Sequence, residues 1–197
     1  MSRHAGIFLD RDGTINEEID FLTSPDSLNL IDGSARAIRE ANECGFKVFV
    51  ITNQSGIARG ILTEENLAEI HSALLNKLAL HNAHIDAIYY CPHHPDAVDV
   101  KYRVVCDCRK PGTGMLMKAV QEFGIDLERS YVIGDRMIDV QTGNNSGATS
   151  ILVLTGYGRK ELELCAENNI DISFVASDLG AAIRHIKDTV HHGQPSS

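Results

Sequence analysis

Residues 6–14 read GIFLDRDGT, a short apolar run that ends in two carboxylates, Asp10 and Asp12, two positions apart. An apolar run of this length before Asp and Gly is typical of a buried strand that ends in a polar turn. Because side chains alternate along an extended chain, Asp10 and Asp12 can both face a crevice beyond the strand if the backbone stays extended. A polar turn alone would also explain the motif, so its meaning depends on the rest of the chain.

Short apolar runs alternate with helical patterns along the chain, which predicts an α/β fold with a three-layer, doubly wound and mostly parallel sheet. The predicted strands are Gly6–Leu9, Lys47–Thr52, Ile85–Tyr90, Ser130–Ile133, Thr149–Val153 and Ser173–Ala176. The predicted helices are Gly33–Cys44, Thr63–Leu80 with Thr63 as its N-cap, Gly112–Phe123, Arg136–Ser146 and Asp178–Val190. We expect one domain over residues 1–190, without a large cap domain, and a polar tail over residues 191–197.

The composition restricts the class of function. The chain has 197 residues and a net charge of −9, from 27 acidic and 18 basic residues. This charge disfavours nucleic acid, whose binding needs a basic face. No apolar run approaches the ~20 residues of a membrane span, and the first residues lack the apolar core of a signal peptide. We therefore expect a cytoplasmic monomer that acts on a small molecule, with neither a membrane nor a nucleic acid as partner.

The two carboxylates after the first strand suit phosphoryl transfer. One carboxylate can attack phosphorus and form an acyl phosphate, which divides hydrolysis into two easier steps. The second carboxyl group can protonate the leaving alcohol and later deprotonate water. This division of labour requires surroundings that separate the pKa values of the two groups.

Polar side chains also follow two other predicted strands. Residues 52–56, TNQSG, offer the hydroxyl and amide groups that a phosphoryl group needs, although a capped connection to a helix would look similar. Asp135 follows the fourth strand, and Asp139 lies one helical turn later, with oxygens that suit Mg²⁺. Because ligands of open α/β sheets bind at the carboxyl ends of the strands, Asp10, Thr52 and Asp135 should meet in one crevice. The sequence leaves two roles for Asp139: it could lie close to the metal, or it could cap the helix.

A basic pair, Arg109 and Lys110, precedes the third predicted helix. Lys110 can place a point charge on a transferring phosphoryl group, and Arg109 can bind a second anionic group through two hydrogen bonds. Arg59 and Arg136 are weaker candidates for this second contact. A solvated charge pair is the alternative interpretation. Pro111 and the glycines beside it indicate a tight, fixed loop, which favours a functional role.

Three of the five cysteines cluster with histidines between positions 91 and 108. An odd number of cysteines without an export signal argues against a disulfide framework. Three thiolates and one imidazole are a common closed set for structural Zn²⁺, and His94 is a competing ligand. The expected ligands are Cys91, His93, Cys106 and Cys108. A loop this long and polar needs something to hold it, and a zinc loop over 91–108 would also fix Arg109 and Lys110.

The order of these motifs resembles the haloacid dehalogenase superfamily of phosphatases, over about Ile7–Gly158. The shared pattern is Asp-x-Asp-Gly-Thr, a Thr after a strand, a Lys, and Gly-Asp-x₃-Asp. Longer stretches look like the bacterial heptose bisphosphate phosphatases and their near relatives, the histidinol-phosphate phosphatases. These stretches are FLDRDGTIN at 8–16, TNQSGIARG at 52–60, YCPHHP at 90–95 and CDCRKP at 106–111.

The resemblance implies a Rossmann-like, haloacid dehalogenase-like fold and a role for each matching residue. Asp10 would be the nucleophile and Asp12 the general acid and base, while Thr52 and Lys110 would stabilise the phosphoryl group. Asp10, the backbone carbonyl of Asp12, and Asp135 would hold Mg²⁺. The implied substrate contacts are Arg11, Glu18, Ile19, Asp20, Phe21, Asn53, Gln54, Ser55, Arg109 and Arg136. In residues 17–21, EEIDF keeps only the aromatic end of the Asp-His-Gly-Tyr-like stretch of relatives, where the sugar is held.

The resemblance further implies a phosphatase that removes the 7-phosphate of a heptose 1,7-bisphosphate in the synthesis of lipopolysaccharide precursors. Histidinol phosphate or another small phosphomonoester is the alternative substrate. A zinc-stabilised binding module without activity is a third possibility. The intact set of Asp10, Asp12, Lys110 and Asp135 argues against this last possibility.

Overall fold

Strand β1 (His4–Leu9) lies at the centre of a six-stranded sheet in the computed structural model, which describes residues 4–192. The other strands are β2 (Lys47–Asn53), β3 (Ala87–Cys91), β4 (Ile125–Gly134), β5 (Thr149–Val153) and β6 (Phe174–Ala176). Their order is β3-β2-β1-β4-β5-β6, and each neighbouring pair is parallel. The predicted doubly wound α/β fold is confirmed.

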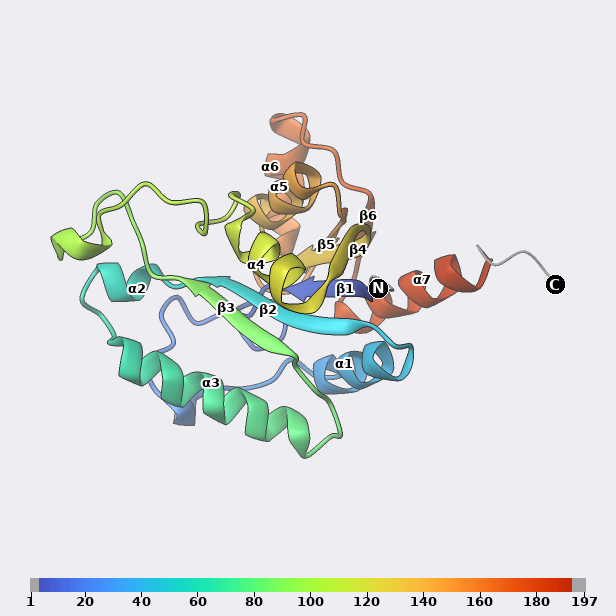
Figure 1. Ribbon diagram of the computed structural model, residues 1–197, viewed down its shortest axis with the longest axis horizontal. Coiled ribbons are helices and arrows are strands. Elements are labelled where there is room, and N and C mark those ends of the chain that lie inside the picture. Colours follow the sequence, from blue (N-terminus) through green and yellow to red (C-terminus); the bar gives the residue numbers. More distant parts are fainter. Residues whose placement is uncertain (1–3, 193–197) are drawn as a thin grey trace.

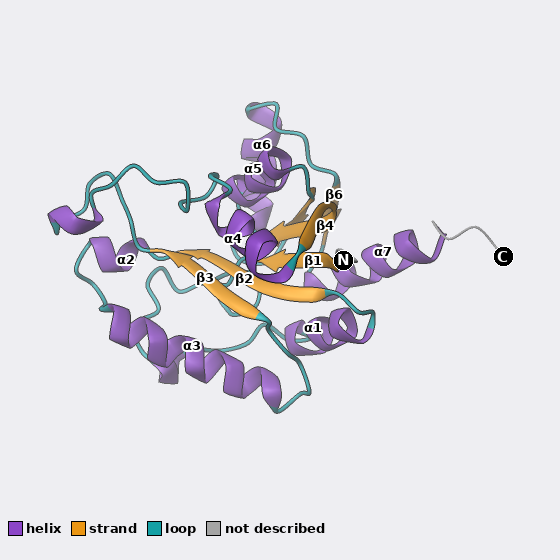
Figure 2. Ribbon diagram, in the orientation of Figure 1, coloured by secondary structure: helices purple, strands orange, loops and turns teal. Residues whose placement is uncertain are grey.

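The strands bury side chains on both faces of the sheet, which explains their continuous apolar sequences. Phe8 packs on one helical layer, whereas Ile7 and Leu9 pack on the other. The layer on Ile7 and Leu9 consists of α1 (Ser34–Glu43), α3 (Glu64–Ala79) and α7 (Leu179–His192). The opposite layer consists of α4 (Gly114–Phe123), α5 (Met137–Ser146) and α6 (Gly158–Glu167). Figures 1 and 2 show these two layers on either side of the sheet.

The predicted helices all form, with shifted ends. Thr63 caps α3 as predicted, because its side-chain oxygen accepts from the backbone N–H of Asn66 at 3.1 Å. Helix α4 begins two residues later than predicted, since a turn closed by Gly112 N–H and Arg109 O precedes it. Helix α7 continues to His192, two residues into the predicted tail, and residues 193–197 lie outside the described residues.

Other elements were not predicted. They are the short helix α2 (Ser55–Ala58), helix α6, and the 3₁₀ turns Pro25–Ser27 and Val100–Tyr102. Strand β4 starts at Ile125, five residues before the predicted start, and its pairing with β1 shifts register between Ala5 and Ile7. Within residues 4–192 the two longest connections are residues 10–33, from β1 to α1, and residues 92–113, from β3 to α4, so the described chain has no large cap domain, as predicted.

The strand order reverses between β1 and β4, and ligands of open α/β sheets bind outside the carboxyl ends of the strands at such a point. Asp10 directly follows β1, and Asp135 directly follows β4. The topology therefore brings two residues that are 125 positions apart in sequence to opposite sides of one crevice.

Among the described residues, none of the helices has both the length and the apolar character needed to cross a bilayer.

Candidate active site

A cavity of about 320 Å³ opens at the carboxyl edge of the sheet, above β1 and β2. Its volume falls at the lower end of the roughly 300–1,000 Å³ that small-molecule sites occupy. The predicted site residues that line it are Asp10, Asp12, Glu18, Asp20, Phe21, Thr52, Asn53, Gln54, Ser55, Arg109, Lys110 and Arg136. The residues that line it without having been predicted as site residues are Leu22, Gly56, Arg59, Leu62, His94 and Ile138.

Lys110 lies at the floor of the cavity, 3% exposed, with its ammonium group fully paired. Its Nζ donates to Asp10 Oδ1 at 2.8 Å, to Asp139 Oδ1 at 2.6 Å and to Ile51 O at 3.0 Å. Burial alone would lower the pKa of Lys110, but the Asp10 and Asp139 carboxylates outweigh it and raise the pKa. Asp139 also accepts from the backbone N–H of Arg136 at 3.0 Å, so it both caps α5 and fixes the lysine.

The loop around Lys110 is tied to the end of β2. Asn53 Nδ2 donates to Lys110 O at 3.2 Å, and Lys110 N donates to Asn53 Oδ1 at 3.0 Å. Next along the loop, Arg109 Nη1 donates to His93 O at 3.0 Å. Asn53 thus positions the lysine as well as lining the cavity.

Asp12 is held as a carboxylate by donors on several sides. Arg11 donates through Nε at 3.1 Å and Nη2 at 2.7 Å, Asn16 Nδ2 at 2.9 Å, and Gln54 Nε2 at 3.1 Å. Burial raises the pKa of Asp12, but the Arg11 charge and these hydrogen bonds outweigh burial, and the net pKa is lowered. Gln54 also donates to Thr52 Oγ1 at 2.8 Å, so one amide links Asp12 to Thr52.

Two predicted substrate contacts do not line the cavity. Arg11 is only 1% exposed, and its guanidinium group faces Asp12. Ile19 is 43% exposed and is absent from the cavity wall. Their contact with a substrate stays a prediction.

Arg136 connects the start of α5 to the loop after β1. Its Nη2 lies 3.4 Å from Glu18 Oε2, and its guanidinium carbon lies 4.3 Å from the centre of the Tyr157 ring. Tyr157 in turn donates to Asp20 Oδ1 at 3.0 Å. The predicted sugar-binding residues Glu18 and Asp20 are therefore held by the opposite side of the site.

Asp135 is fully buried below the cavity lining. Its Oδ2 accepts from the backbone N–H of Tyr157 at 2.8 Å, whereas its Oδ1 has no hydrogen-bond partner in the described part of the chain. Gly13 has φ of 81°, and a Cβ at this position would lie 2.2 Å from Asp135 Oδ2. Only glycine lets the turn after Asp12 pass this close to the carboxylate.

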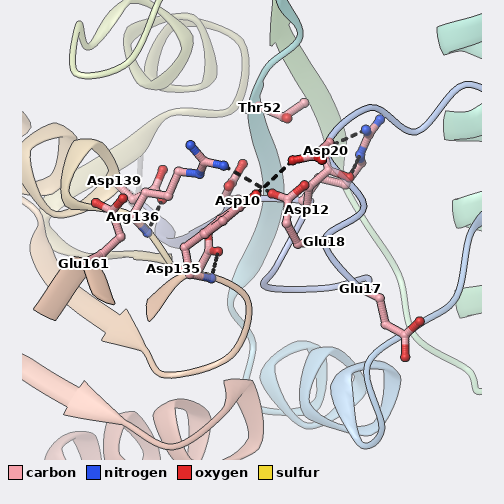
Figure 3. A network of polar contacts seen from close by, with 12 residues as sticks. Asp10, Asp12, Glu17, Glu18, Asp20, Thr52, Asp135, Arg136, Asp139 and Glu161 are labelled. Carbon is pink, nitrogen blue, oxygen red and sulfur yellow. Dashed lines mark hydrogen bonds and ion pairs between the residues drawn. The ribbon is translucent and has the colours of Figure 1, made fainter. Parts of the chain in front are cut away.

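The carboxylates beside Lys110 form a group that could hold a metal ion. Ligand oxygens of Asp10, Asp135 and Asp139 lie within 4.8 Å of one another, and Figure 3 shows these side chains gathered at one place while Glu17 points away. Burial and the neighbouring carboxylates raise the pKa of Asp10 to about 7 and that of Asp135 to about 8. Three buried carboxylates against one ammonium, with Asp135 Oδ1 unpaired, fit a hard divalent cation such as Mg²⁺.

A second group of ligands lies in the loop between β3 and α4. The three sulfur atoms are 3.1–3.6 Å apart, and His93 Nδ1 lies 3.7 Å from Cys91 Sγ and 3.4 Å from Cys108 Sγ. Four ligands around Zn²⁺ at about 2.0–2.3 Å have separations close to these, and sulfurs this far apart form no disulfide. The group is Cys91, His93, Cys106 and Cys108, as predicted.

His94, the competing ligand in the sequence, lies outside this group. Its Nδ1 accepts from the backbone N–H of Asp96 at 3.1 Å, and its Nε2 lies 3.4 Å from Arg59 Nη2 at the cavity wall. The sequence suggested His94 only as a competing zinc ligand, and Arg59 only as a weaker candidate than Arg109 for contact with a second phosphate. The stretches that contain them, IARG and PHHP, entered the sequence analysis only as part of the resemblance to known phosphatases.

The family model and the relatives that match this chain are phosphatases and related hydrolases, in agreement with the chemistry of the site. The HAD-hydrolase-like family model matches residues 107–182. The D-glycero-beta-D-manno-heptose-1,7-bisphosphate 7-phosphatase of Photorhabdus laumondii is 43% identical over 183 residues, 92% of this chain and 96% of that protein. The protein of the same name from Escherichia coli K12 is 42% identical over 180 residues, 90% of this chain and 93% of that protein.

A solved structure resembles the whole described fold. It is D,D-heptose 1,7-bisphosphate phosphatase from B. bronchiseptica, complexed with magnesium and phosphate. The TM-score is 0.83 at 35% sequence identity, and the match covers 94% of this chain and 99% of that one.

Proposed function

Because the chain belongs to the HAD-like phosphatase family that includes the D-glycero-D-manno-heptose-1,7-bisphosphate 7-phosphatases, we propose that it removes the 7-phosphate of such a heptose bisphosphate. One observation carries the proposal. Asp10, Asp12 and Lys110 share a cavity with three further cations, Arg59, Arg109 and Arg136, which the phosphoryl transfer itself does not need. A reaction centre beside spare cations suits a substrate with two anionic groups.

In the first step, Asp10 attacks the phosphorus of the 7-phosphate. The bond from phosphorus to the C7 oxygen breaks, an aspartyl phosphate forms, and the proton of Asp12 passes to the leaving oxygen. Asp12 is a carboxylate before substrate binds, and a nearby phosphate dianion raises its pKa, so that it takes up the required proton from solvent. Thr52, at the end of β2, and Lys110, in the loop before α4, stabilise the charge of the phosphoryl group through the Thr52 hydroxyl and the Lys110 ammonium group.

In the second step, water attacks the phosphorus of the aspartyl phosphate. Asp12 takes a proton from this water, inorganic phosphate leaves, and the Asp10 carboxylate is restored. The hydrogen bonds that Arg11, Asn16 and Gln54 donate favour the ionised Asp12 that this step uses. Mg²⁺ bound to the predicted ligands, which are Asp10, Asp135 and the carbonyl of Asp12, would supply positive charge to the nucleophile and to the phosphoryl oxygens.

The proposal includes a structural zinc in the 91–108 loop. The group of Cys91, His93, Cys106 and Cys108 leaves no open ligand position, which suits a structural rather than a catalytic metal. Cys108 directly precedes Arg109 and Lys110, so a metal at this group would fix both cations. A cytoplasmic location and a monomeric state complete the proposal.

A comparison of kcat/KM across three phosphorylated compounds tests which of them is the substrate. We expect kcat/KM with Mg²⁺ to be highest for heptose 1,7-bisphosphate, lower for histidinol phosphate and lowest for an aryl phosphate. Phosphorus NMR of the sugar product should show the signal of the 1-phosphate kept and that of the 7-phosphate lost. Faster turnover of histidinol phosphate than of the bisphosphate would move the assignment to that substrate.

A further inference from the structure

Arg59 and His94 present two hydrogen-bond donors to each other at the wall of the cavity. Arg59 Nη2 lies 3.4 Å from His94 Nε2. The backbone N–H of Asp96 donates to His94 Nδ1 at 3.1 Å, so the lone pair of Nδ1 is used and the ring proton resides on Nε2. A guanidinium group has no acceptor. Neither N–H can therefore accept from the other, and no described residue between 4 and 192 gives the pair a common acceptor.

The two side chains come from segments that are joined to each other. Arg59 follows the last residue of α2, and His94 lies in the loop that carries the expected zinc ligands. Val98 N donates to Ala58 O at 2.9 Å, and His94 N donates to Tyr102 O at 3.1 Å. Figure 1 shows this loop running beside α2. The donor pair is thus held by backbone hydrogen bonds on both sides.

The pair lies in the same cavity as the reaction centre but differs from it in charge. Asp10 and Asp12 contribute carboxylates at one part of the lining, whereas Arg59 and Arg109 contribute guanidinium groups at another. Arg109 uses Nη1 on the backbone oxygen of His93, and its other donors remain for a ligand. Two N–H donors only 3.4 Å apart, with the guanidinium group of Arg109 in the same cavity, suit an anionic oxygen as their acceptor.

We propose that Arg59 and His94 bind the phosphate that the enzyme does not hydrolyse. One phosphate oxygen between Nη2 of Arg59 and Nε2 of His94 accepts a hydrogen bond from both, and Arg109 assists from the adjacent wall. This inference rests on the proposed function and assigns a part of the bisphosphate to residues that take no part in phosphoryl transfer. The pair therefore determines the preference for a bisphosphate over a monophosphate.

The test compares two substrates in variants of the pair. Arg59→Gln removes the charge, His94→Phe keeps the ring shape without the donor, and His94→Gln restores an N–H donor. Arg129→Gln is the matched control, because Arg129 is exposed and does not line the cavity. We expect Arg59→Gln and His94→Phe to lower the ratio of kcat/KM for heptose 1,7-bisphosphate to that for heptose 7-phosphate roughly 10- to 100-fold. His94→Gln should recover part of the ratio, and Arg129→Gln should leave it unchanged.

Product inhibition gives a second measurement that does not depend on turnover of the bisphosphate. Heptose 1-phosphate keeps the distal phosphate, so it should inhibit hydrolysis of p-nitrophenyl phosphate by wild type. The inhibition constant should rise roughly 10-fold or more in Arg59→Gln, which lies outside the zinc loop and is expected to keep its zinc content and melting temperature.

The outcomes separate the inference from the function on which it rests. If wild type shows no preference for the bisphosphate over heptose 7-phosphate, the proposed function is wrong. If wild type shows the preference but Arg59→Gln lowers kcat/KM equally for both substrates and leaves product inhibition unchanged, the function stands and the assignment of the pair is overturned.

Discussion

Asp10 and Asp12 lie two residues apart, yet their surroundings shift their pKa values in opposite directions. Burial and the carboxylate of Asp139 raise the pKa of Asp10 to about 7, although Lys110 opposes them. Despite burial, the guanidinium charge of Arg11 and the four hydrogen bonds from Arg11, Asn16 and Gln54 lower the pKa of Asp12. The two carboxyl groups thus have different surroundings, as separate roles require, but the raised pKa is that of the nucleophile. A divalent cation bound beside Asp10 would lower its pKa and favour the attacking carboxylate.

Replacement of the nucleophile is the most direct test of these roles. Asp10→Asn keeps the size of the side chain but removes the attacking carboxylate, so we expect turnover to fall by at least roughly 10³-fold. Glu17→Gln is the matched control, because Glu17 is exposed and points away from the cavity (Figure 3). Mass spectrometry of rapidly quenched wild-type enzyme should find phosphate on Asp10. Covalent phosphate on any other residue would refute the assignment.

A partly buried histidine outside the cavity makes stability depend on pH. Burial, followed by the charge of Arg11, lowers the pKa of His71 from 6.5 to about 4. Between these values the unfolded chain binds a proton that the folded chain excludes, so this contribution is complete above pH 6.5 and is lost as the pH falls toward 4. Urea unfolding at pH 7 and pH 5 should show that wild type loses about 2 kcal/mol more than His71→Gln.

The exposed His81, at the end of α3, provides the control for this measurement. His81→Gln should retain the pH dependence of wild type. An equal loss of stability in wild type and His71→Gln would show that His71 does not exclude the proton.

The residue-level predictions succeed where a motif places a side chain directly after a strand. Asp10, Thr52 and Asp135 meet as expected because the carboxyl ends of parallel strands share one edge. Arg59 and His94 meet only because the long loop folds back onto α2, a contact between segments 35 positions apart that local patterns do not encode. The role of Asp139 could not be predicted for the same reason, because it depends on a contact with Lys110, which lies on another loop.

At the scale of elements, two of the side-chain groups that hold the loop between β3 and α4 can be tested against each other. One is the group of three cysteines and His93. The other is Glu64 at the start of α3, whose carboxylate accepts from Tyr90 Oη at 3.0 Å and from Tyr102 Oη at 2.7 Å. Only the first group lies next to Arg109 and Lys110, so the two attachments should differ in their effect on activity.

Loss of zinc should therefore lower stability and activity together. We expect about one zinc per chain in the purified protein, and Cys106→Ser should lower the zinc content, the melting temperature and kcat/KM. Glu64→Gln is the comparison variant, because it weakens the far attachment and leaves the ligands in place. It should lower the melting temperature slightly and keep both zinc and most activity. Zinc-free protein with unchanged melting temperature and rate would show that the metal does not hold the loop.

The elements that the sequence did not predict have weak local signals. Helix α6 buries only Gly158 and Cys165 fully, so its apolar face is too narrow to stand out from a polar stretch. The first half of β4 contains Asp126, Glu128 and Arg129, which read as a loop, and only pairing with β1 makes part of it extended. Tertiary contacts, rather than local propensity, determine both elements.

At the scale of the whole molecule, the chain carries a net charge of −9 and yet is proposed to bind a substrate with two phosphates. Local charge resolves the conflict, because Lys110, Arg109 and Arg136 line the cavity and a bound divalent cation would add to them. Without that cation, the crevice between β1 and β4 holds more buried carboxylate than Lys110 can balance. Metal binding should then act on the stability of the whole fold and not on catalysis alone.

Magnesium should raise the melting temperature, because a ligand that binds only the folded state stabilises it. At a concentration about 100 times its dissociation constant the gain is about 2.7 kcal/mol, which for a chain of this length is roughly 5–10 °C. Asp135→Asn removes the carboxylate whose Oδ1 lacks a partner among the described residues, so it should abolish most of this shift. Asp171→Asn changes an exposed carboxylate on the loop before β6 and should keep the shift.

EDTA should abolish turnover, and Mg²⁺ but not Zn²⁺ should restore it, since carboxylate and carbonyl oxygens favour the harder ion. Full activity after exhaustive chelation, or an equal Mg²⁺ shift in Asp135→Asn and wild type, would place the metal elsewhere or remove it from the reaction.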